Sequence, residues 1–326
     1  MLNFWQSLQK PIIALAPMED VTDTVFREVI RSVSESDALH VMFTEFTSAD
    51  GLCNEKGREF VATRLHVSET ERELLKATNT KLVAQIWGSD PVKFHESAKL
   101  ISAMGLFDGI DINMGCPVKK VVKNHSCSDL INHPEMAKQI VVATREGTNL
   151  PVSVKTRIGF SSIVTEEWIG QLLEVHPAAI TIHGRTRSMM SNGLALWDEI
   201  GKAVQLRNQS KSSTLILGNG DVDSHATALA KVRDFGVDGV MVGRGVFKNP
   251  WMFNAVDKEI SRQMRIDLVV KHIQLYDTTW KEKGNFNVLK RFFKIYLNGF
   301  DGAAQWRDQL MHCKNCGEAL NIIEKM

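Results

Sequence analysis

Short runs of apolar and β-branched residues alternate with longer amphipathic stretches over about the first 250 residues of the chain. Such alternation is typical of repeated strand–helix units around a parallel sheet. The apolar runs predict eight strands, at residues 12–15, 41–44, 82–86, 109–112, 152–155, 179–182, 214–217 and 239–242. The stretches between them predict helices at residues 23–33, 91–104, 134–144, 165–175, 196–205, 224–234 and 250–259.

Two architectures fit this alternation: a closed TIM (β/α)8 barrel and an open, doubly wound sheet. Polar and glycine-rich clusters follow almost every predicted strand, and they are spread over the whole alternating region. A doubly wound sheet would gather them at one switch point, whereas a barrel brings the carboxyl ends of all its strands to one mouth. The pattern therefore favours an α/β fold of the TIM barrel type.

After residue 260 the alternation stops and the apolar residues follow helical spacing. They form one stripe, followed by helical segments at 289–297 and 310–323; the stripe consists of Leu268, Val269, His272, Ile273, Tyr276 and Trp280. This predicts a small, all-helical carboxyl-terminal domain whose boundary falls between Lys258 and Asp267. We divide the chain into a barrel domain, residues 1–258, and a helical domain, residues 259–326.

The net charge of +1 hides a difference between these two parts. Residues 1–259 carry 28 Lys and Arg against 31 Asp and Glu, whereas residues 260–326 carry 11 against 7. A basic tail favours an anionic partner, but an ordinary solvated helical surface explains the same charges equally well.

The composition places the chain among globular proteins. With 326 residues, 44% hydrophobic and 24% charged, it is neither disordered, collagen-like nor a disulfide scaffold. No apolar run approaches the roughly 20 residues of a membrane helix, and the amino terminus lacks the features of a secretory signal. An odd number of cysteines agrees with free thiols. We expect a cytoplasmic protein without membrane attachment, and nothing indicates an obligate protein partner.

A pair of cysteines near the carboxyl terminus has the spacing of half a zinc site or of a redox pair. Cys313 and Cys316 form a CxxC segment, and His312 precedes it. No second pair completes four ligands, because Cys53 and Cys127 are isolated in the sequence. We interpret the spacing as chance and expect no metal.

Glycines and one arginine follow the last two predicted strands; they and their neighbour are Gly218, Asn219, Gly220, Gly243 and Arg244. Glycine lets backbone amides approach an anion, and a guanidinium adds charged donors, so this set suits a phosphate group. The loops after strands seven and eight of a TIM barrel commonly bind phosphate. The alternative is that these glycines only shape tight turns. No Rossmann or Walker motif competes for a phosphate.

Three further polar residues lie at strand ends beside that candidate site. Lys155 and His183 end the fifth and sixth predicted strands, and Gln85 lies near the end of the third. A flavin would use such a cation, imidazole and amide around its ring. Taken singly, a Lys or His at a strand end is more often a surface residue or a satisfied core group. Their joint position favours a flavin site.

Cys116 is the most informative residue, because it follows the fourth predicted strand with a glycine before it and a proline after it. With these neighbours a thiol faces the mouth, although an arbitrary cysteine is more often a small buried apolar residue. The surrounding segment, with Lys-Lys-Val at 119–121, resembles the signature of the tRNA-dihydrouridine synthases; it reads Asn113, Met114, Gly115, Cys116, Pro117.

Other segments resemble that family in the same order and spacing. They are Ala-Pro-Met at 16–18, Ala-Gln-Ile at 84–86, Gly-Ser-Asp-Pro at 88–91, Val-Lys-Thr-Arg at 154–157, Gly159, His-Gly-Arg-Thr-Arg at 183–187, Asn-Gly-Asp at 219–221, Gly-Arg at 243–244 and Asn-Pro-Trp at 249–251. Each motif alone is shared with other flavin barrels. The ordered set covers about residues 11–255 and is specific.

The resemblance implies an FMN enzyme that reduces a uridine of tRNA to 5,6-dihydrouridine, with NADPH or NADH as the source of electrons. Hydride from the flavin adds at C6 of the uracil, and the residue that Cys116 matches delivers a proton to C5, for which a neutral thiol is better suited than a thiolate. Asn113 and Arg185, with Lys155 and His183, orient the base. The implied FMN contacts are Pro17, Met18, Glu19, Gln85, Lys155, His183, Asn219, Gly220, Asp221, Gly243 and Arg244.

A uridine stacked inside folded RNA must be drawn out of its stack, which costs roughly a few kcal/mol that backbone contacts have to offset. The basic tail suits this task and is expected to bind RNA. Its cations are Lys281, Lys283, Lys290, Arg291 and Lys294, interleaved with Phe286, Phe292, Phe293 and Tyr296. We expect most of these aromatics in the helical core, and Lys290, Arg291 and Lys294 on the substrate.

The chain departs from the family pattern at two places. Residues 123–130 are bulkier and more polar than the glycine-containing stretch usual there, and residues 188–192 lack the aromatic that often follows the His-Gly-Arg-Thr-Arg segment. Two other readings remain open at this point. One is an FMN barrel that reduces a free pyrimidine, like the dihydroorotate dehydrogenases, and the other is an RNA-binding relative without catalysis.

Overall fold

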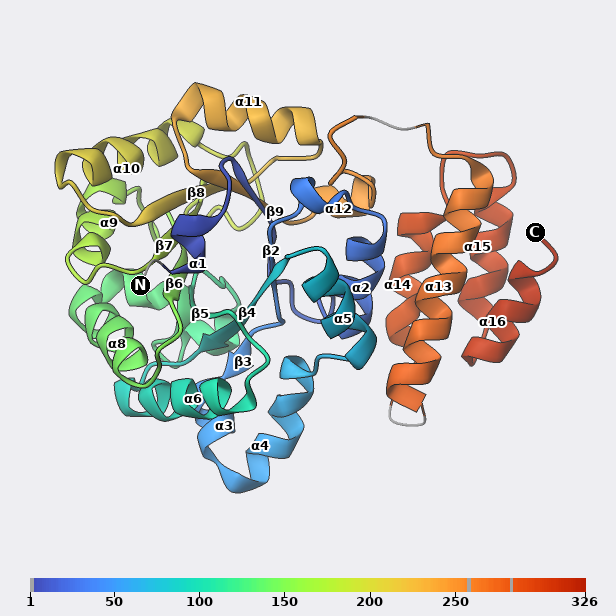
Figure 1. Ribbon diagram of the computed structural model, residues 1–326, viewed down its shortest axis with the longest axis horizontal. Coiled ribbons are helices and arrows are strands. Elements are labelled where there is room, and N and C mark those ends of the chain that lie inside the picture. Colours follow the sequence, from blue (N-terminus) through green and yellow to red (C-terminus); the bar gives the residue numbers. More distant parts are fainter. Residues whose placement is uncertain (1–2, 257–258, 282–283) are drawn as a thin grey trace.

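The computed structural model describes residues 3–256, 259–281 and 284–326. Its centre is a closed barrel of parallel strands surrounded by helices, with a bundle of helices beside it (Figure 1). The strands are β1 (Ile12–Leu15), β2 (Val41–Phe43), β3 (Thr47–Ser48), β4 (Lys81–Trp87), β5 (Gly109–Met114), β6 (Val152–Arg157), β7 (Ala179–His183), β8 (Leu215–Asn219) and β9 (Gly239–Val242).

Eight of these strands close the ring in the order β2-β1-β9-β8-β7-β6-β5-β4, and β2 pairs with β4 to complete it. Every pairing is parallel. The short β3 pairs only with the carboxyl end of β4. The predicted TIM barrel is therefore confirmed, and each of the eight predicted strands matches an observed one to within two residues at either end.

Alternation of side chains along the strands divides the core into two clusters. Inside the barrel lie apolar residues such as Val41, Phe43 and Leu217, joined by Trp5 from the first helix. The larger cluster fills the space between the strands and the outer helices, and continues into the carboxyl-terminal helices. At the carboxyl ends of β4, β5 and β6 the inward positions become polar, which opens the barrel to a site.

The helices of the barrel domain are α1 (Phe4–Ser7), α2 (Thr24–Ser32), α3 (Ala49–Cys53), α4 (Glu55–Ala62), α5 (Glu69–Ala77), α6 (Pro91–Met104), α7 (Lys119–Val122), α8 (Pro134–Glu146), α9 (Thr165–Leu173), α10 (Trp197–Gln209), α11 (His225–Phe235) and α12 (Gly245–Lys248). Three 3-10 turns are η1 (Ser36–Ala38), η2 (Thr63–Leu65) and η3 (Cys127–Asn132). Six of the seven predicted helices are present.

The helix predicted at residues 250–259 is wrong. The helix at this place is the short α12, and Asn249 then takes an extended conformation with φ −143°. Trp251, Met252 and Phe253 are all buried in succession, which a helix with one apolar face would not allow. The amide of Asn254 holds this turn by donating to the carbonyl oxygens of Val33 and Trp251.

In the described residues of the carboxyl-terminal bundle, four α-helices are present: α13 (Arg262–Trp280), α14 (Asn287–Tyr296), α15 (Ala303–His312) and α16 (Cys316–Ile323). The start of α13 lies within the predicted boundary interval, although Lys258 itself lies outside the described residues. The single helix predicted at 310–323 is instead two, because the side chain of Asn315 caps a new helix by accepting from the amide of Glu318.

The bundle contacts the barrel through α13 and α14 (Figure 1). The indole of Trp280 donates to Asp23 Oδ2 over 2.9 Å, and Arg291 donates to the carbonyl oxygen of Asp20 over 2.7 Å. Both acceptors lie between β1 and α2, so the bundle is attached close to the mouth of the barrel. Within the described part of the chain, no helix combines the length and apolar character that a membrane crossing requires.

Candidate active site

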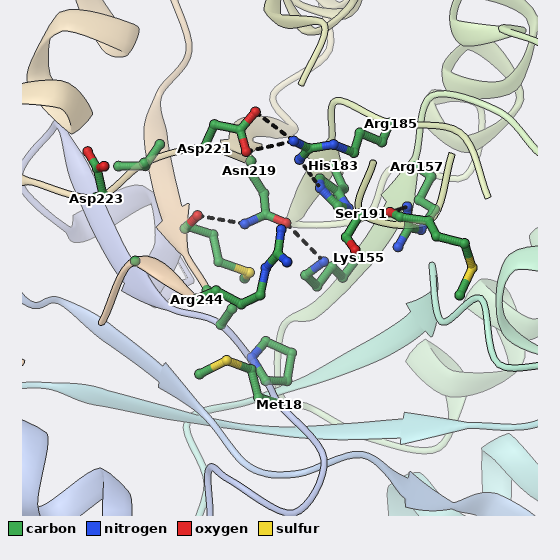
Figure 2. A pocket seen from close by; sticks show the side chains of 18 of the residues that line it. Met18, Lys155, Arg157, His183, Arg185, Ser191, Asn219, Asp221, Asp223 and Arg244 are labelled. Atoms are coloured by element: carbon green, nitrogen blue, oxygen red, sulfur yellow. Dashed lines mark hydrogen bonds and ion pairs between the residues drawn. The ribbon is translucent and has the colours of Figure 1, made fainter. Parts of the chain in front are cut away.

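A cavity of about 700 Å³ lies at the carboxyl ends of the strands, on the side of β6 to β9 (Figure 2). Nine of the residues expected to contact FMN form part of its wall, together with Arg185; the nine are Pro17, Met18, Lys155, His183, Asn219, Gly220, Asp221, Gly243 and Arg244. As the described residues form it, the wall does not include Glu19, Gln85, Asn113 or Cys116. Pro117 lines it, so Cys116 is one residue away.

Lys155, Asn219 and the backbone of β9 form a chain of hydrogen bonds across the cavity floor (Figure 2). Lys155 Nζ donates to Asn219 Oδ1 over 3.3 Å, and Asn219 Nδ2 donates to the carbonyl oxygen of Met241 over 2.8 Å. Burial, and after it the charge of the nearby Arg157 guanidinium, lower the pKa of Lys155 to about 8. The ammonium group therefore stays mostly charged at neutral pH and has spare donors for a ligand.

His183 is held neutral beside these cations. Burial, then the charges of Lys155 and Arg157, lower its pKa to about 2. Its Nε2 lies 3.2 Å from Arg185 Nη1. Because a guanidinium can only donate, Nε2 accepts, and the proton of the imidazole is on Nδ1. His183 thus presents one N–H donor of known position and no charge.

Arg185 is committed to partners within the chain. It is 2% exposed, its Nη2 lies 2.7 Å from both carboxylate oxygens of Asp221, and it donates to the carbonyl oxygen of Gly193 over 2.6 Å. The ion pair holds the pKa of Asp221 below its usual range against the opposing effect of burial. These contacts make Arg185 a support for the loop after β7 and for Asp221.

Gln85 and Asn113 belong to a buried network that extends from β4 to β6. Asn113 Nδ2 donates to Gln85 Oε1 over 3.0 Å, Gln85 Nε2 donates to Asp111 over 2.7 Å, and Ser153 donates to the other oxygen of Asp111 over 2.6 Å. Burial raises the pKa of Asp111 to about 6. The network fixes the orientation of both amides. Asn113 Oδ1 also accepts from the backbone amide of Cys116 over 2.9 Å.

The partner of Cys116 is Cys127, which the sequence does not place near it. The thiol of Cys127 hydrogen-bonds to the sulfur of Cys116, and this contact is the main cause that lowers the pKa of Cys116 to about 7; the backbone amide of Val118 contributes. Cys127 is buried and its own pKa is raised. Cys127 has a left-handed φ of 56° at the start of η3. This tight turn of the loop is not evident from the sequence.

Arg157 is a further residue that sequence reasoning did not assign. Burial lowers its pKa to about 10, and its donors reach the carbonyl oxygens of Gly115, Thr186 and Met190 at 2.6–3.1 Å. It therefore joins the loop of Cys116 to the loop after β7. The sequence feature that could have identified Arg157 is its position at the end of a strand, in the Val-Lys-Thr-Arg motif.

The glycines expected to bind phosphate serve different purposes. A Cβ at Gly218 would lie 2.2 Å from the ring of Trp197, so this glycine makes room for the indole and is not part of the cavity wall. Gly220 has φ +124°, which other residues rarely adopt. A Cβ at Gly243 would have Ala16 as its nearest neighbour at 3.8 Å, so glycine here leaves cavity space open.

Glu19 lies at the edge of this region and pairs with a residue of the segment before β4. Arg64 donates to Glu19 Oε1 from both Nε and Nη2, over 2.9 and 2.6 Å. Nearby, burial and the charges of Asp23 and Glu19 raise the pKa of Glu45 to about 7. Glu19 is therefore engaged in an ion pair rather than exposed in the cavity.

The cations of α14 differ in their availability. Lys290 is half-buried with its Nζ over the ring of Phe286, Arg291 is exposed and contacts Asp20, and Lys294 is exposed. Lys283 lies outside the described residues. The aromatic residues between them are buried, as predicted; they are Phe286, Phe292, Phe293 and Tyr296.

Comparison with known proteins identifies the family behind this geometry. Residues 14–326 match the family model described as dihydrouridine synthase (Dus). The chain belongs to the dihydrouridine synthase family. It is 41% identical over 324 residues to the "Probable tRNA-dihydrouridine synthase 2" of Bacillus subtilis (strain 168), across 99% of this chain and 96% of that protein. It is 40% identical over 325 residues to the "Probable tRNA-dihydrouridine synthase" of Staphylococcus aureus (strain COL), across 99% and 95%.

A solved structure agrees with the fold of this chain. Histamine dehydrogenase from Rhizobium sp. 4-9 superposes with a TM-score of 0.54 at 12% sequence identity, over 84% of this chain and 51% of that one. At that identity the likeness shows the barrel alone.

The dihydrouridine synthase cavity carries an excess of positive charge. Its described lining includes five cationic side chains, Lys155, Arg157, Arg185, Arg244 and Lys248, against the two carboxylates of Asp221 and Asp223, a net of +3. Arg244 is exposed, and its guanidinium has no hydrogen-bond partner among the described residues. An anionic ligand would supply the missing negative charge.

Proposed function

We propose that this oxidoreductase binds FMN in the cationic cavity and reduces a specific uridine of tRNA to 5,6-dihydrouridine, with NADPH as the source of electrons. The observation that carries the proposal is the joint placement of Lys155, neutral His183 and unpaired Arg244 around one cavity, one residue from Cys116. The family membership and the printed names of the relatives support the same substrate.

The donor set of the cavity fits a flavin phosphate. Arg244 offers a free guanidinium, and Gly243 leaves its backbone open to a ligand, as phosphate groups require. Lys155 supplies a cation and His183 an N–H donor for the polar edge of the ring system. The chemistry that a reduced flavin supplies when bound is a hydride, which a uracil ring accepts at C6.

Cys116 would complete the reduction by giving its proton to C5 of the uracil. A pKa of about 7 keeps much of the thiol protonated at neutral pH, and a general acid works best when its pKa lies near the working pH. Asn113 Oδ1 holds the backbone amide of Cys116, while Arg157 holds the carbonyl oxygen of Gly115. Together they fix the direction of the loop that presents the thiol.

The helical bundle would hold the tRNA. Lys294 and Arg291 are exposed on α14, close to the contact between the bundle and the barrel mouth. If these side chains contact phosphates, replacing Lys290, Arg291 and Lys294 by Ala should weaken tRNA binding. The slope of the logarithm of the binding constant against the logarithm of salt concentration should become shallower by up to about two units for single-stranded contacts. The same change should leave the flavin content of the protein unaltered.

Three measurements on the purified full chain test the proposal. Flavin absorbance establishes the cofactor, oxidation of NADPH that depends on unmodified tRNA establishes the substrate class, and a gain of two hydrogens at one uridine by mass spectrometry establishes the product. Reduction of a free pyrimidine without RNA would favour the dihydroorotate-type alternative. A colourless protein that still binds tRNA would favour a non-catalytic relative.

A further inference from the structure

Two histidines and one aspartate converge on the loop between α7 and α8, outside the cavity. His125 Nδ1 lies 2.9 Å from Asp129 Oδ2, and His133 Nε2 lies 3.5 Å from the same oxygen. The two imidazole rings are 5.3 Å apart and nearly perpendicular. Taking one ligand atom from each residue, all three atoms lie within 4.8 Å of one another.

The two separations from Asp129 are close to those between the ligand atoms of a tetrahedral zinc ion. Zinc bonds to histidine nitrogen and carboxylate oxygen are about 2.0–2.2 Å long, so two ligand atoms on a tetrahedron lie about 3.3 Å apart. The two distances to Asp129 bracket this value. The two imidazole nitrogens lie within 4.8 Å of each other. Imidazole and carboxylate ligands favour zinc, cobalt or nickel over magnesium or calcium, which prefer oxygen alone.

The surrounding contacts hold the three residues in place. Asn132 donates to the other carboxylate oxygen of Asp129 over 2.8 Å, which orients the carboxylate as a supporting residue of a metal site does. The backbone amides of His125 and His133 donate to the carbonyl oxygens of Val122 and Leu130. The side chains of His125 and His133 are 72% and 48% exposed, so an ion can reach them from solvent.

We propose that His125, Asp129 and His133 bind one divalent transition-metal ion of the zinc class, with water in a fourth position. His125 and Asp129 lie in the stretch, residues 123–130, where this chain is bulkier and more polar than its family pattern, and His133 follows it. None of these three described residues lines the cavity, so metal binding can be measured separately from the proposed reduction. It shares η3 with Cys127, so an ion there would also stiffen the loop next to Cys116.

The test uses the full chain without a polyhistidine tag, freed of metal by a chelator. Titration with Zn²⁺ in competition with a chromophoric chelator should give one ion per chain. His125→Ala and Asp129→Asn should each weaken binding at least about 100-fold, since loss of a supporting residue alone weakens binding by about 10- to 100-fold. His312→Ala is the matched control, an exposed histidine outside the cluster, and should not change the affinity.

Two further readouts separate this site from the thiols. The Co²⁺ complex should lack the charge-transfer band of thiolate ligands, and Zn²⁺ should raise the melting temperature of wild type but not of His125→Ala. A thiolate band, a zinc affinity unchanged in His125→Ala and Asp129→Asn, or no binding by folded wild type would each overturn the proposal. Equal melting temperatures of the metal-free proteins confirm that the variants are folded.

Discussion

Two kinds of cation in this molecule are withdrawn from water: Arg27, which pairs with Glu71 between α2 and α5, and the mouth residues Lys155 and Arg157. Only Arg27 has a carboxylate partner within the described chain. Arg27 Nε and Nη2 reach the two oxygens of Glu71 at 2.6 and 2.8 Å, and its remaining donors reach the carbonyl oxygens of Thr22 and His66. Both side chains of the pair are 1% exposed or less. Every polar atom of this arginine has a partner.

In the mouth, Lys155 and Arg157 meet amide and carbonyl oxygens, and no carboxylate of a described residue is in direct contact with them. Their pKa values fall to about 8 and about 10, which records that the surroundings disfavour their charge. Two kinds of buried charge can therefore be distinguished by whether a carboxylate lies in contact. A compensated pair supports the fold, whereas an uncompensated group marks a place where a ligand is expected.

The largest effect should come from the mouth and concern activity alone. Cys116→Ala removes the proposed proton donor, so dihydrouridine formation should fall about 10²- to 10⁴-fold, the usual contribution of a general acid. The flavin content and the unfolding midpoint should stay at wild-type values. Cys53→Ala on α3 is the control and should keep full turnover. Wild-type turnover in Cys116→Ala would end the assignment of the acid.

The ion pair should show the opposite behaviour. Arg27→Met leaves the Glu71 carboxylate buried without a partner and should lower the free energy of unfolding by about 3–5 kcal/mol, measured by urea denaturation. The double variant Arg27→Met, Glu71→Leu should recover most of this loss, because no charge is left buried. If Arg27→Met lowers the free energy of unfolding by less than about 1 kcal/mol, the ion pair does not support the fold in this way.

Lys155→Met tests the buried charge in the mouth. Flavin binding should weaken by about tenfold or more, since a hydrogen bond to a charged group contributes roughly 1.5–3 kcal/mol. In flavin-free protein, wild type should gain stability relative to this variant as the pH rises from about 8 to the ordinary lysine value of 10.5. The reason is that the unfolded chain still binds a proton that the folded Lys155 has released. If the difference in unfolding free energy between the two proteins stays constant across this pH range, the pKa of Lys155 is not lowered in the folded chain.

The smallest effect concerns the neighbour of the acid. Cys127→Ala removes the hydrogen bond that lowers the pKa of Cys116, so this pKa should rise from about 7 toward the ordinary value of 9.0. The rate of alkylation of Cys116 should then increase at higher pH than in wild type, followed in a Cys53→Ser background. Because the acid stays protonated longer, the alkaline loss of turnover should move in the same direction. An unchanged alkylation profile would mean that Cys127 does not act on Cys116.

Much of the fold was predictable because the strands of a buried parallel sheet are short and apolar throughout. The eight runs matched the observed strands, and Pro91 and Asp90 defined the start of α6. The predictions failed where apolar residues are buried for tertiary reasons, as in residues 251–253, or where one capping residue divides a helical stretch, as at Asn315. Periodicity alone does not distinguish these cases.

The chain alone determined the barrel, the motif order along its strand ends and the position of Cys116, because these depend on local spacing and on the shared direction of parallel strands. Only the tertiary structure decided that Cys127 contacts Cys116, that Asp221 is taken by Arg185, that Gly218 makes room for Trp197, and that His125, Asp129 and His133 face one another. The spacing of four residues between His125, Asp129 and His133 can be read from the sequence. The expectation of no metal, however, considered only the cysteines and His312. Contacts of this kind depend on how loops fold back, and a local pattern of polar residues does not encode that path.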